Sequence, residues 1–169
     1  DGKSSTVIFT AKLLRSAGYK VGYFSSISYS EGGEEKTNSF KMTMPGRFFL
    51  QKFLRTLVNN ECDLGIIEVT SEGIKQKRNL CIDFHIVLIT NLKPEHTESH
   101  GGFENYKKAK ATLFDNLHKS YKKGVPKTII VNEDDSLAKE FALYNSEKVI
   151  SFDDILKLYL SFLRDLYMV

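Results

Sequence analysis

Short apolar runs and amphipathic segments alternate along most of this chain, and this alternation limits the fold more than any other feature. The runs 63–70 and 82–90 are nearly continuous in Ile, Leu and Val, which is typical of strands buried on both faces. The segment 47–58 instead places its Phe and Leu side chains on one helical face. Strands that alternate with helices form a mostly parallel sheet flanked by helices. The pattern therefore predicts an α/β fold.

The other predicted elements complete this pattern. Helices are expected at 4–17, 47–58, 103–123, 135–144 and 154–167, and strands at 20–25, 63–70, 82–90, 127–131 and 148–152. The stretch 26–41, rich in Ser, Glu, Gly and Asn, is predicted to be a long polar loop. Asp153 or Asp154 is expected to cap the last helix. That helix is apolar on almost every face, so we expect it to cover the sheet or to contact another segment or chain.

Length and composition narrow the class of protein. The 169 residues, 41% hydrophobic and 27% charged, predict a single globular domain over 1–169. The 24 basic and 21 acidic side chains are interleaved, which does not favour a nucleic-acid partner. No apolar run reaches the ~18 residues that a membrane span needs, and no signal peptide is evident, so we expect a cytoplasmic protein. Cys62 and Cys81 lack partners at metal-ligand spacing and are interpreted as reduced, buried thiols.

The sequence DGKSST at positions 1–6 directly precedes the first predicted helix. It matches the second half of the phosphate-binding loop G-x-x-x-x-G-K-[ST]. In such a loop Gly2 would let the backbone approach a phosphate, Lys3 would reach the β- and γ-phosphates, and Ser4 would bind Mg²⁺. A charged and frayed N-terminus explains this short segment equally well.

Polar residues that follow predicted strands are the next candidates, because ligands of open parallel sheets bind at the carboxyl ends of strands. Glu68 is suited to a nucleotide-bound Mg²⁺, although a solvated Glu at a strand terminus is the simpler alternative. His96 follows the next strand and is either a metal or phosphate ligand or a surface residue of a turn. His85 and His118 have no partner at ligand spacing and are expected to be structural.

A basic stretch in the predicted helix 103–123 is harder to interpret. Residues 106–110 read YKKAK, which by itself indicates a solvated basic face. Lys110 stands between two Ala residues, which leaves room for another part of the backbone to approach it.

Six segments stand in the same order as in the Mur ligases, over roughly residues 1–135: DGKSST, MTMPGRFFLQKFL, IIEVTSEGIKQKR, TNLKPEHTESHG, FENYKKAKATLF and VNEDD. The chain thus resembles the central, ATP-binding domain of this family, most closely the branch that adds the third peptide residue to UDP-N-acetylmuramoyl-dipeptide. The resemblance implies a P-loop NTPase-like fold, truncated within the phosphate loop and on its carboxyl-terminal side. It also implies ATP-driven amide-bond formation through an acyl phosphate, in the synthesis of peptidoglycan precursors for the cell wall.

The resemblance also implies a role for individual residues. The catalytic residues would be Lys3, His96 and Lys110, and ATP would contact Gly2, Lys3, Ser4, Ser5 and Asn91. The Mg²⁺ ligands would be Ser4, Glu68, His96 and Lys110, the last as a carbamate. The UDP-muramoyl-peptide would contact Thr43, Thr70, Ser71 and Arg78. An amino acid would be the other substrate, and an amino-terminal and a carboxyl-terminal ligase domain would be the partners of this domain.

Some positions depart from the family's usual pattern. Residues 43–45 are Thr-Met-Pro where Thr-Thr-Pro is usual, residues 70–73 are Thr-Ser-Glu-Gly where Ser-Ser-His-Ala/Gly is usual, and residues 95–96 are Glu-His in place of Asp-His. Two alternatives remain: a polyglutamate- or cyanophycin-type ligase, and a non-catalytic fragment that binds a nucleotide or mediates contacts. The EVTSEG and TMPG segments favour the muramoyl branch. We expect no catalysis by this chain alone, and the sequence does not specify which amino acid is added.

Overall fold

The computed structural model describes residues 2–40, 42–93, 101–121, 124–155 and 157. The chain divides into two units, Asp1–Ile82 and Asp83–Val169, and each is described by itself. Parallel strands alternate with helices in both units, which confirms the predicted α/β class. The assignment of 1–169 to one domain stays a prediction.

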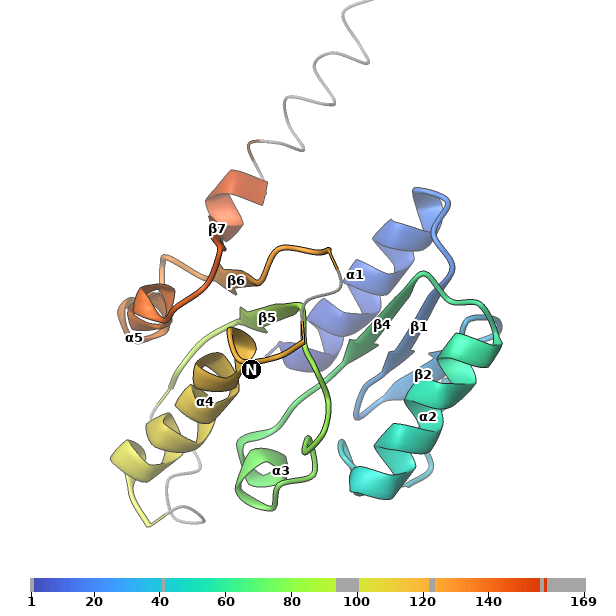
Figure 1. The fold of residues 1–169 in the computed structure, drawn as a ribbon, viewed down its shortest axis with the longest axis horizontal. Helices are drawn as coiled ribbons and strands as arrows, with labels where there is room; N and C mark the ends of the chain where they lie inside the picture. Colours follow the sequence, from blue (N-terminus) through green and yellow to red (C-terminus); the bar gives the residue numbers. More distant parts are fainter. Residues whose placement is uncertain (1, 41, 94–100, 122–123, 156, 158–169) are drawn as a thin grey trace, which may run out of the picture. The chain divides into compact units, whose positions relative to one another are not determined.

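The first unit is built on a four-stranded sheet in the order β3-β2-β1-β4. Strands β1 (Val21–Phe24) and β4 (Leu64–Ile67) are parallel, whereas β2 (Ser28–Glu31) and β3 (Lys36–Thr37) extend the sheet in antiparallel fashion. The helices of this unit are α1 (Lys3–Ser16), α2 (Arg47–Asn59) and α3 (Ser71–Lys75). Figure 1 shows α1 and α2 on opposite faces of the sheet, so β1 is buried on both.

The alternation of side chains along β1 explains how both helices pack. Val21 and Tyr23 point to the face where Val7 and Ala11 of α1 lie. Phe24 points to the other face and joins a cluster with Phe53 and Leu57 of α2. Glycines stand opposite each other in β1 and β4, at 22 and 65, beneath α2. A Cβ at Gly22 would lie 2.2 Å from Cδ2 of Leu57, so the absence of side chains there lets α2 approach the sheet.

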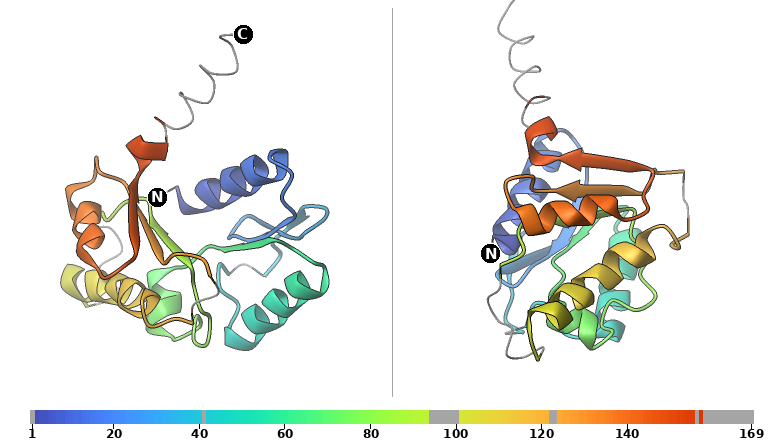
Figure 2. Two further views of the ribbon diagram at one scale, coloured as in Figure 1. Left: turned by 45° about the horizontal axis from the view of Figure 1, so that its top comes forward. Right: turned by 90° about the vertical axis from the view of Figure 1, so that its left-hand side faces the viewer.

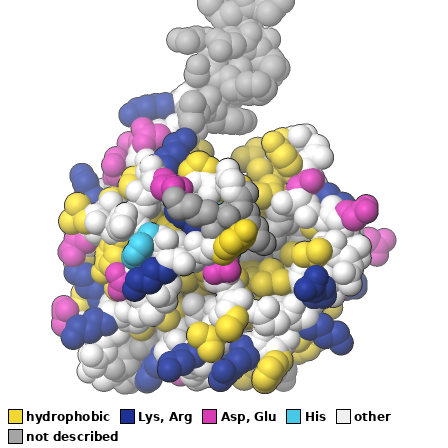
Figure 3. Space-filling view, viewed as in Figure 1, with side chains coloured by type: hydrophobic (Ala, Val, Ile, Leu, Met, Phe, Trp, Pro, Cys, Tyr) yellow, Lys and Arg dark blue, Asp and Glu magenta, His cyan; other side chains and the backbone are white. Residues whose placement is uncertain are grey.

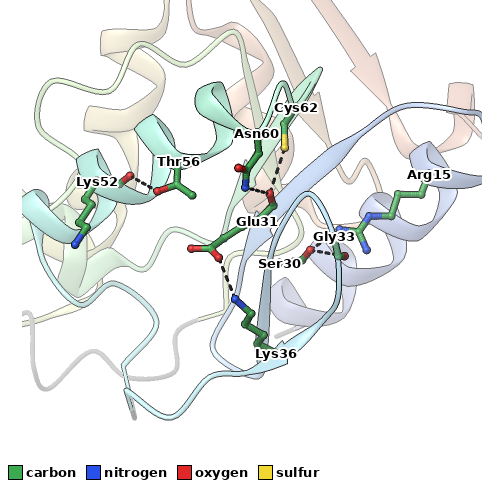
Figure 4. A network of polar contacts seen from close by, with 9 residues as sticks. All are labelled: Arg15, Ser30, Glu31, Gly33, Lys36, Lys52, Thr56, Asn60 and Cys62. Carbon is green, nitrogen blue, oxygen red and sulfur yellow. Dashed lines mark hydrogen bonds and ion pairs between the residues drawn. The ribbon is translucent and has the colours of Figure 1, made fainter.

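The prediction of a long polar loop over 26–41 is wrong, because this stretch contains the β2–β3 hairpin. Ser28 and Ser30 of β2 are buried and hydrogen-bonded inside the unit: the Ser30 hydroxyl, for example, donates to the carbonyl of Gly33 at 2.9 Å. In Figure 4 the side chains of Asn60 and Cys62 converge on the carbonyl of Glu31, at 2.8 and 3.6 Å. The polar composition of 26–41 suggested that its side chains are exposed. The polar side chains of β2 can be buried because they form hydrogen bonds with the neighbouring strand and loop.

The second unit contains a three-stranded parallel sheet in the order β5-β6-β7. Its strands are β5 (Ile86–Ile89), β6 (Thr128–Val131) and β7 (Lys148–Ser151), and its helices are α4 (Phe103–Leu117), α5 (Ser136–Lys139) and the 3₁₀ helix η2 (Glu140–Leu143). Figure 2 shows α4 and α5 beside this sheet, and both contribute to one hydrophobic cluster with β5 and β6.

Several predicted boundaries in the second unit are wrong. Helix α4 ends at Leu117 rather than at 123, and the predicted helix 135–144 is divided between α5 and η2. Burial on both faces, predicted for 82–90, is not seen in β5: Val87 and Ile89 are buried, whereas Ile86 and Leu88 are exposed. The physical reason is that α4, α5 and η2 all pack on the face of the sheet that Val87 and Ile89 share.

The start of the last helix also differs from the prediction. Ser151 Oγ accepts the backbone N–H of Asp154 at 3.0 Å, and the Asp154 carboxylate accepts the N–H of Ser151 at 3.1 Å. This reciprocal pair is a capping box, so Ser151 is the cap and Asp154 is its partner three residues on. Most of the predicted helix 154–167, and its expected contact, lies outside the described residues.

Surface features complete the description. Cys62 is half-buried, and burial raises the pKa of its thiol. Cys81 is exposed, contrary to the prediction, because it lies in a turn before β5 instead of in the apolar strand itself.

No helix in the described part of the chain is both long enough and apolar enough to span a membrane. On the face seen in Figure 3, basic side chains are dispersed among acidic and uncharged ones.

Candidate functional site

The carboxylate of Glu68 is the centre of the candidate site in the first unit. Glu68 directly follows β4 and is only 5% exposed. Its Oε2 accepts the hydroxyl of Ser4 at 2.7 Å, the backbone N–H of Ser26 at 2.9 Å and the hydroxyl of Ser26 at 3.3 Å. Within the described residues, Oε1 of Glu68 receives no hydrogen bond. One oxygen is thus held in place, and the other is available to a ligand.

Ser26 is a functional candidate that the sequence analysis missed. Its hydroxyl lies 2.6 Å from that of Ser4, so these two side chains and Glu68 form one cluster. The signal was present in the sequence, because Ser26 comes shortly after β1 and therefore at the carboxyl end of a parallel strand. The assignment of 26–41 to a featureless loop concealed it.

The predicted phosphate-binding residues lie at the N-terminus of α1. Gly2 immediately precedes the helix in a left-handed conformation, with φ 74°, which glycine adopts without strain. Lys3 and Ser4 are half-buried and Ser5 is exposed in the first turn. The N-terminus of a 14-residue helix carries unpaired backbone N–H groups and a partial positive charge, both of which favour an anion. Ser4 joins this helix end to Glu68.

The second unit has its own polar cluster where β5 and β6 end. An open hollow of about 480 Å³ is lined there by Asn91, Leu92, Lys93, Asn132, Asp134, Asp135 and Ser136. Asp135 Oδ2 accepts the backbone N–H of Leu92 at 2.7 Å, and Oδ1 accepts those of Leu137 and Ala138 at 3.0 Å. Asp135 thereby caps α5 and also fixes the segment after β5.

These contacts change the acidity of Asp135. Burial by itself raises the pKa of this carboxyl. The three backbone N–H groups and the charge of Lys110 act in the opposite direction and prevail, so the pKa lies below its ordinary value.

Lys110, the predicted metal ligand of α4, has the surroundings of a cation in this structure. Its Nζ donates to the carbonyl of Asn91 at 3.3 Å and lies 4.9 Å from the centre of the Tyr106 ring. A carbonyl oxygen and an aromatic face both attract an ammonium group. Whether Lys110 is carbamylated stays a prediction.

The predicted metal site is only partly described. Ser4 and Glu68 come together in the first unit, Lys110 belongs to the second unit, and His96 lies outside the described residues. Among the described residues, no group of three or more His, Cys, Asp and Glu side chains is placed to hold a metal. For Glu68 the fit to Mg²⁺ is good, because a buried carboxylate with one uncommitted oxygen is a typical ligand for this cation.

The predicted substrate residues of the first unit also cluster. Thr70 caps α3 by accepting the N–H of Gly73 at 3.0 Å, and Ser71 is the first residue of that helix. The guanidinium of Arg78 donates to the carbonyl of Met44, the neighbour of Thr43. Residues from 43–44 and 70–78 therefore lie together, although the sequence separates them by 26 positions or more.

A comparison with known families identifies this arrangement. The sequence model described as the Mur ligase middle domain matches residues 1–155. The chain belongs to the Mur ligase family. The match includes residues of both units, from the N-terminal end of α1 to the capping box at Ser151.

Individual Mur ligases are similar to this chain over much of its length. It is 35% identical to the UDP-N-acetylmuramyl-tripeptide synthetase of Treponema denticola, over 93% of this chain and 30% of that protein. It is 32% identical to the UDP-N-acetylmuramoyl-L-alanyl-D-glutamate--2,6-diaminopimelate ligase of Bacillus licheniformis, over 90% of this chain and 31% of that protein. The chain thus spans about a third of the length of these relatives.

A solved Mur ligase structure shares the fold. The structure of a UDP-N-acetylmuramoyl-L-alanyl-D-glutamate--2,6-diaminopimelate ligase matches with a TM-score of 0.72 and 22% identity, over 89% of this chain and 30% of that one. At this identity the match supports the fold alone. It agrees with the parallel strands and flanking helices described above.

Proposed function

We propose that this chain is the ATP-binding middle domain of a ligase that joins an amino acid to a UDP-N-acetylmuramoyl-peptide during peptidoglycan precursor synthesis. The observation that carries the proposal is the convergence of Ser4 and Ser26 on buried Glu68, at the N-terminus of α1. Family membership supports it, and so do the names of the relatives. An amino-terminal and a carboxyl-terminal ligase domain, and a cytoplasmic location, are part of the same proposal.

Each candidate residue of the ATP site then has a definite task. The helix N-terminus at Gly2 and the Lys3 ammonium bind the β- and γ-phosphates of ATP, because both present positive charge at one place. Ser4 and Glu68 would hold Mg²⁺, with Ser26 fixing the orientation of the carboxylate. Mg²⁺, when bound, would neutralise charge that develops on the phosphate oxygens. Ser5, and Asn91 of the second unit, would make further contacts with ATP.

The reaction itself is the formation of an amide bond in two steps. The substrate carboxylate attacks the γ-phosphorus of ATP and gives an acyl phosphate and ADP. The amine of the incoming amino acid then attacks the acyl carbon and releases phosphate. Thr43, Thr70, Ser71 and Arg78 would bind the acceptor, and positive charge from Lys3 would stabilise the transferring phosphoryl group. His96 would complete the metal site.

Carbamylation of Lys110 belongs to this proposal as a separate, testable part. Loading the protein with ¹³C-labelled bicarbonate and recording its ¹³C spectrum would give a carbamate signal that disappears in Lys110→Arg. Lys108→Arg, on the same helix, is the matched control and should retain the signal. Absence of a signal that depends on Lys110 would remove the carbamate from the metal site.

The function is tested on the full-length protein with ATP, Mg²⁺, UDP-N-acetylmuramoyl-dipeptide and a panel of amino acids. We expect phosphate release that requires both the acceptor and one amino acid. Lys3→Met should abolish it, whereas Lys12→Met, on the same helix, should not. Turnover with a polyglutamyl acceptor instead would redirect the proposal to the polyglutamate-type branch, and no turnover with any acceptor would refute it.

A further inference from the structure

A closed ring of contacts surrounds Met44 in the first unit. The Sδ atom of Met44 lies 3.5 Å from the backbone nitrogen of Thr70 and 3.8 Å from its hydroxyl. The Thr70 hydroxyl accepts the N–H of Gly73, and the carbonyl of Gly73 accepts the N–H of Arg78 at 2.8 Å. The Arg78 guanidinium closes the ring by donating to the carbonyl of Met44.

The Met44 side chain fills the space inside this ring. It is only 1% exposed, although it belongs to an irregular segment between β3 and α2. A Cβ added to Gly73 would lie 2.2 Å from Sδ and 3.3 Å from Cε of Met44. Gly73 is a helical residue of α3, so the lack of a side chain there matters for space rather than for backbone conformation. Met44 and Gly73 are thus complementary in shape.

The ring places the Arg78 guanidinium at the carbonyl of Met44, where its Nη1 also lies 3.9 Å from Sδ of Met42. The backbone N–H of Arg78 donates to the carbonyl of Gly73, the residue that lies against the Met44 side chain. The guanidinium of Arg78 donates to the carbonyl of Met44 itself. A guanidinium is a planar fork of donors, so its orientation decides which carboxylate or phosphate oxygens it meets. Moving Met44 would displace the carbonyl at 44 and the start of α3 together, and Arg78 with them.

We propose that Met44 is a positioning residue that holds Arg78 in the orientation that binds the anionic acceptor. This inference rests on the function proposed above, in which Arg78 contacts the UDP-muramoyl-peptide. Met44 acts through Arg78 and does not touch the substrate. The buried thioether of Met44 fixes the loop by packing against Gly73.

The test is a set of variants of the full-length protein, assayed for the KM of each substrate. Met44→Ala and Gly73→Ala should each raise the KM for UDP-N-acetylmuramoyl-dipeptide about tenfold, because small displacements of a binding group are costly. The KM for ATP should stay unchanged. The double variant should recover most of the loss, since removal of Sδ and Cε makes room for the new Cβ. Met44→Leu, which preserves volume, should behave like the unchanged protein.

Two controls separate positioning from stability. In an Arg78→Lys background, Met44→Ala should not raise the acceptor KM further, because the affected group is already altered. Leu50→Val, a change in the buried face of α2, should lower stability without changing either KM. Additive effects of Met44→Ala and Arg78→Lys, or an equal rise in the KM for ATP, would contradict the inference.

A spectroscopic readout distinguishes this inference from the proposed function. The ¹⁵Nε–¹Hε signal of Arg78 reports rotation of the guanidinium without any substrate. We expect slow rotation in the unchanged protein and fast rotation in Met44→Ala. If the protein has no ligase activity but this difference is present, the proposed function and the acceptor-binding role of Arg78 fail, whereas the ordering of Arg78 by Met44 stands. If rotation is the same in both proteins, the positioning role fails whatever the activity.

Discussion

Glu68 and Asp135 occupy similar places, each following a parallel strand, yet they differ in what their carboxylates do. Glu68 receives its hydrogen bonds on one oxygen, mostly from hydroxyls, and its second oxygen accepts none within the described residues. Asp135 uses both oxygens on backbone N–H groups of its own unit. Position at a strand end therefore does not distinguish the two carboxylates, whereas the nature and number of their hydrogen-bond donors do.

The largest effect is expected from Glu68→Gln. This change preserves size but removes the charge that binds Mg²⁺, so kcat for phosphate release by the full-length protein should fall about a hundredfold or more. Glu34→Gln, an exposed residue of the same unit, is the control and should be neutral. Activity within a few fold of the unchanged protein would mean that Glu68 is structural, like Asp135.

Ser26→Ala should have a smaller effect on the same site. The hydroxyl to Glu68 is lost while the backbone N–H remains, so the Mg²⁺ concentration for half-maximal activity should rise about tenfold. Ser26→Thr retains a hydroxyl and should restore the unchanged value. Titrating Mg²⁺ at saturating ATP measures the difference, and an unchanged requirement in Ser26→Ala would exclude Ser26 from the site.

Asp135→Ala tests the structural side of the comparison. The variant loses the cap of α5 and the link to Leu92, which should lower the free energy of unfolding by about 2 kcal/mol. Asp134→Ala, the exposed neighbour, should stay within about 0.5 kcal/mol. Chemical unfolding of both variants gives the values. A neutral Asp135→Ala would show that the backbone holds this region without the carboxylate.

The smallest effect is expected from pH. Because the pKa of Asp135 is lower in the folded protein, its charged form stabilises the fold above the pKa of the unfolded chain. That contribution is lost as the pH falls through the folded pKa, which lies below the ordinary value of 3.8. The difference in unfolding free energy between the unchanged protein and Asp135→Ala should therefore shrink below pH 4. A constant difference would contradict the assignment.

Much of the architecture could be predicted from local pattern. The amphipathic face of 47–58 and the apolar runs at 63–70 and 82–90 predicted α2, β4 and β5 within a few residues. The polar strand β2 could not be predicted in this way, because its serines are buried only by virtue of hydrogen bonds to Ser25, Tyr23 and Arg15. The five-residue helix α3 is too short to show helical periodicity and depends on its Thr70 cap.

The residues of the candidate site also divide into those that the sequence revealed and those that only the structure revealed. DGKSST and Glu68 could be found because each stands at a recognisable place, a helix start or a strand end. Met44 could not, because its importance lies in its contact with a residue 26 positions away. Ser26 was missed although it stands at a strand end, because its contact with Glu68 spans 42 positions. The joining of Glu68 with His96 and Lys110 in one metal site remains a prediction of the family resemblance.

By itself the sequence determined the α/β class and the family, and it predicted the residues that would bind phosphate, since these depend on periodicity and on short motifs. The tertiary structure alone decided which oxygen of Glu68 is occupied, that Asp135 is committed to the backbone, and that Met44 fits against Gly73. The reason is physical: a motif fixes which groups are present, whereas hydrogen bonds and close packing depend on the position of atoms from distant segments.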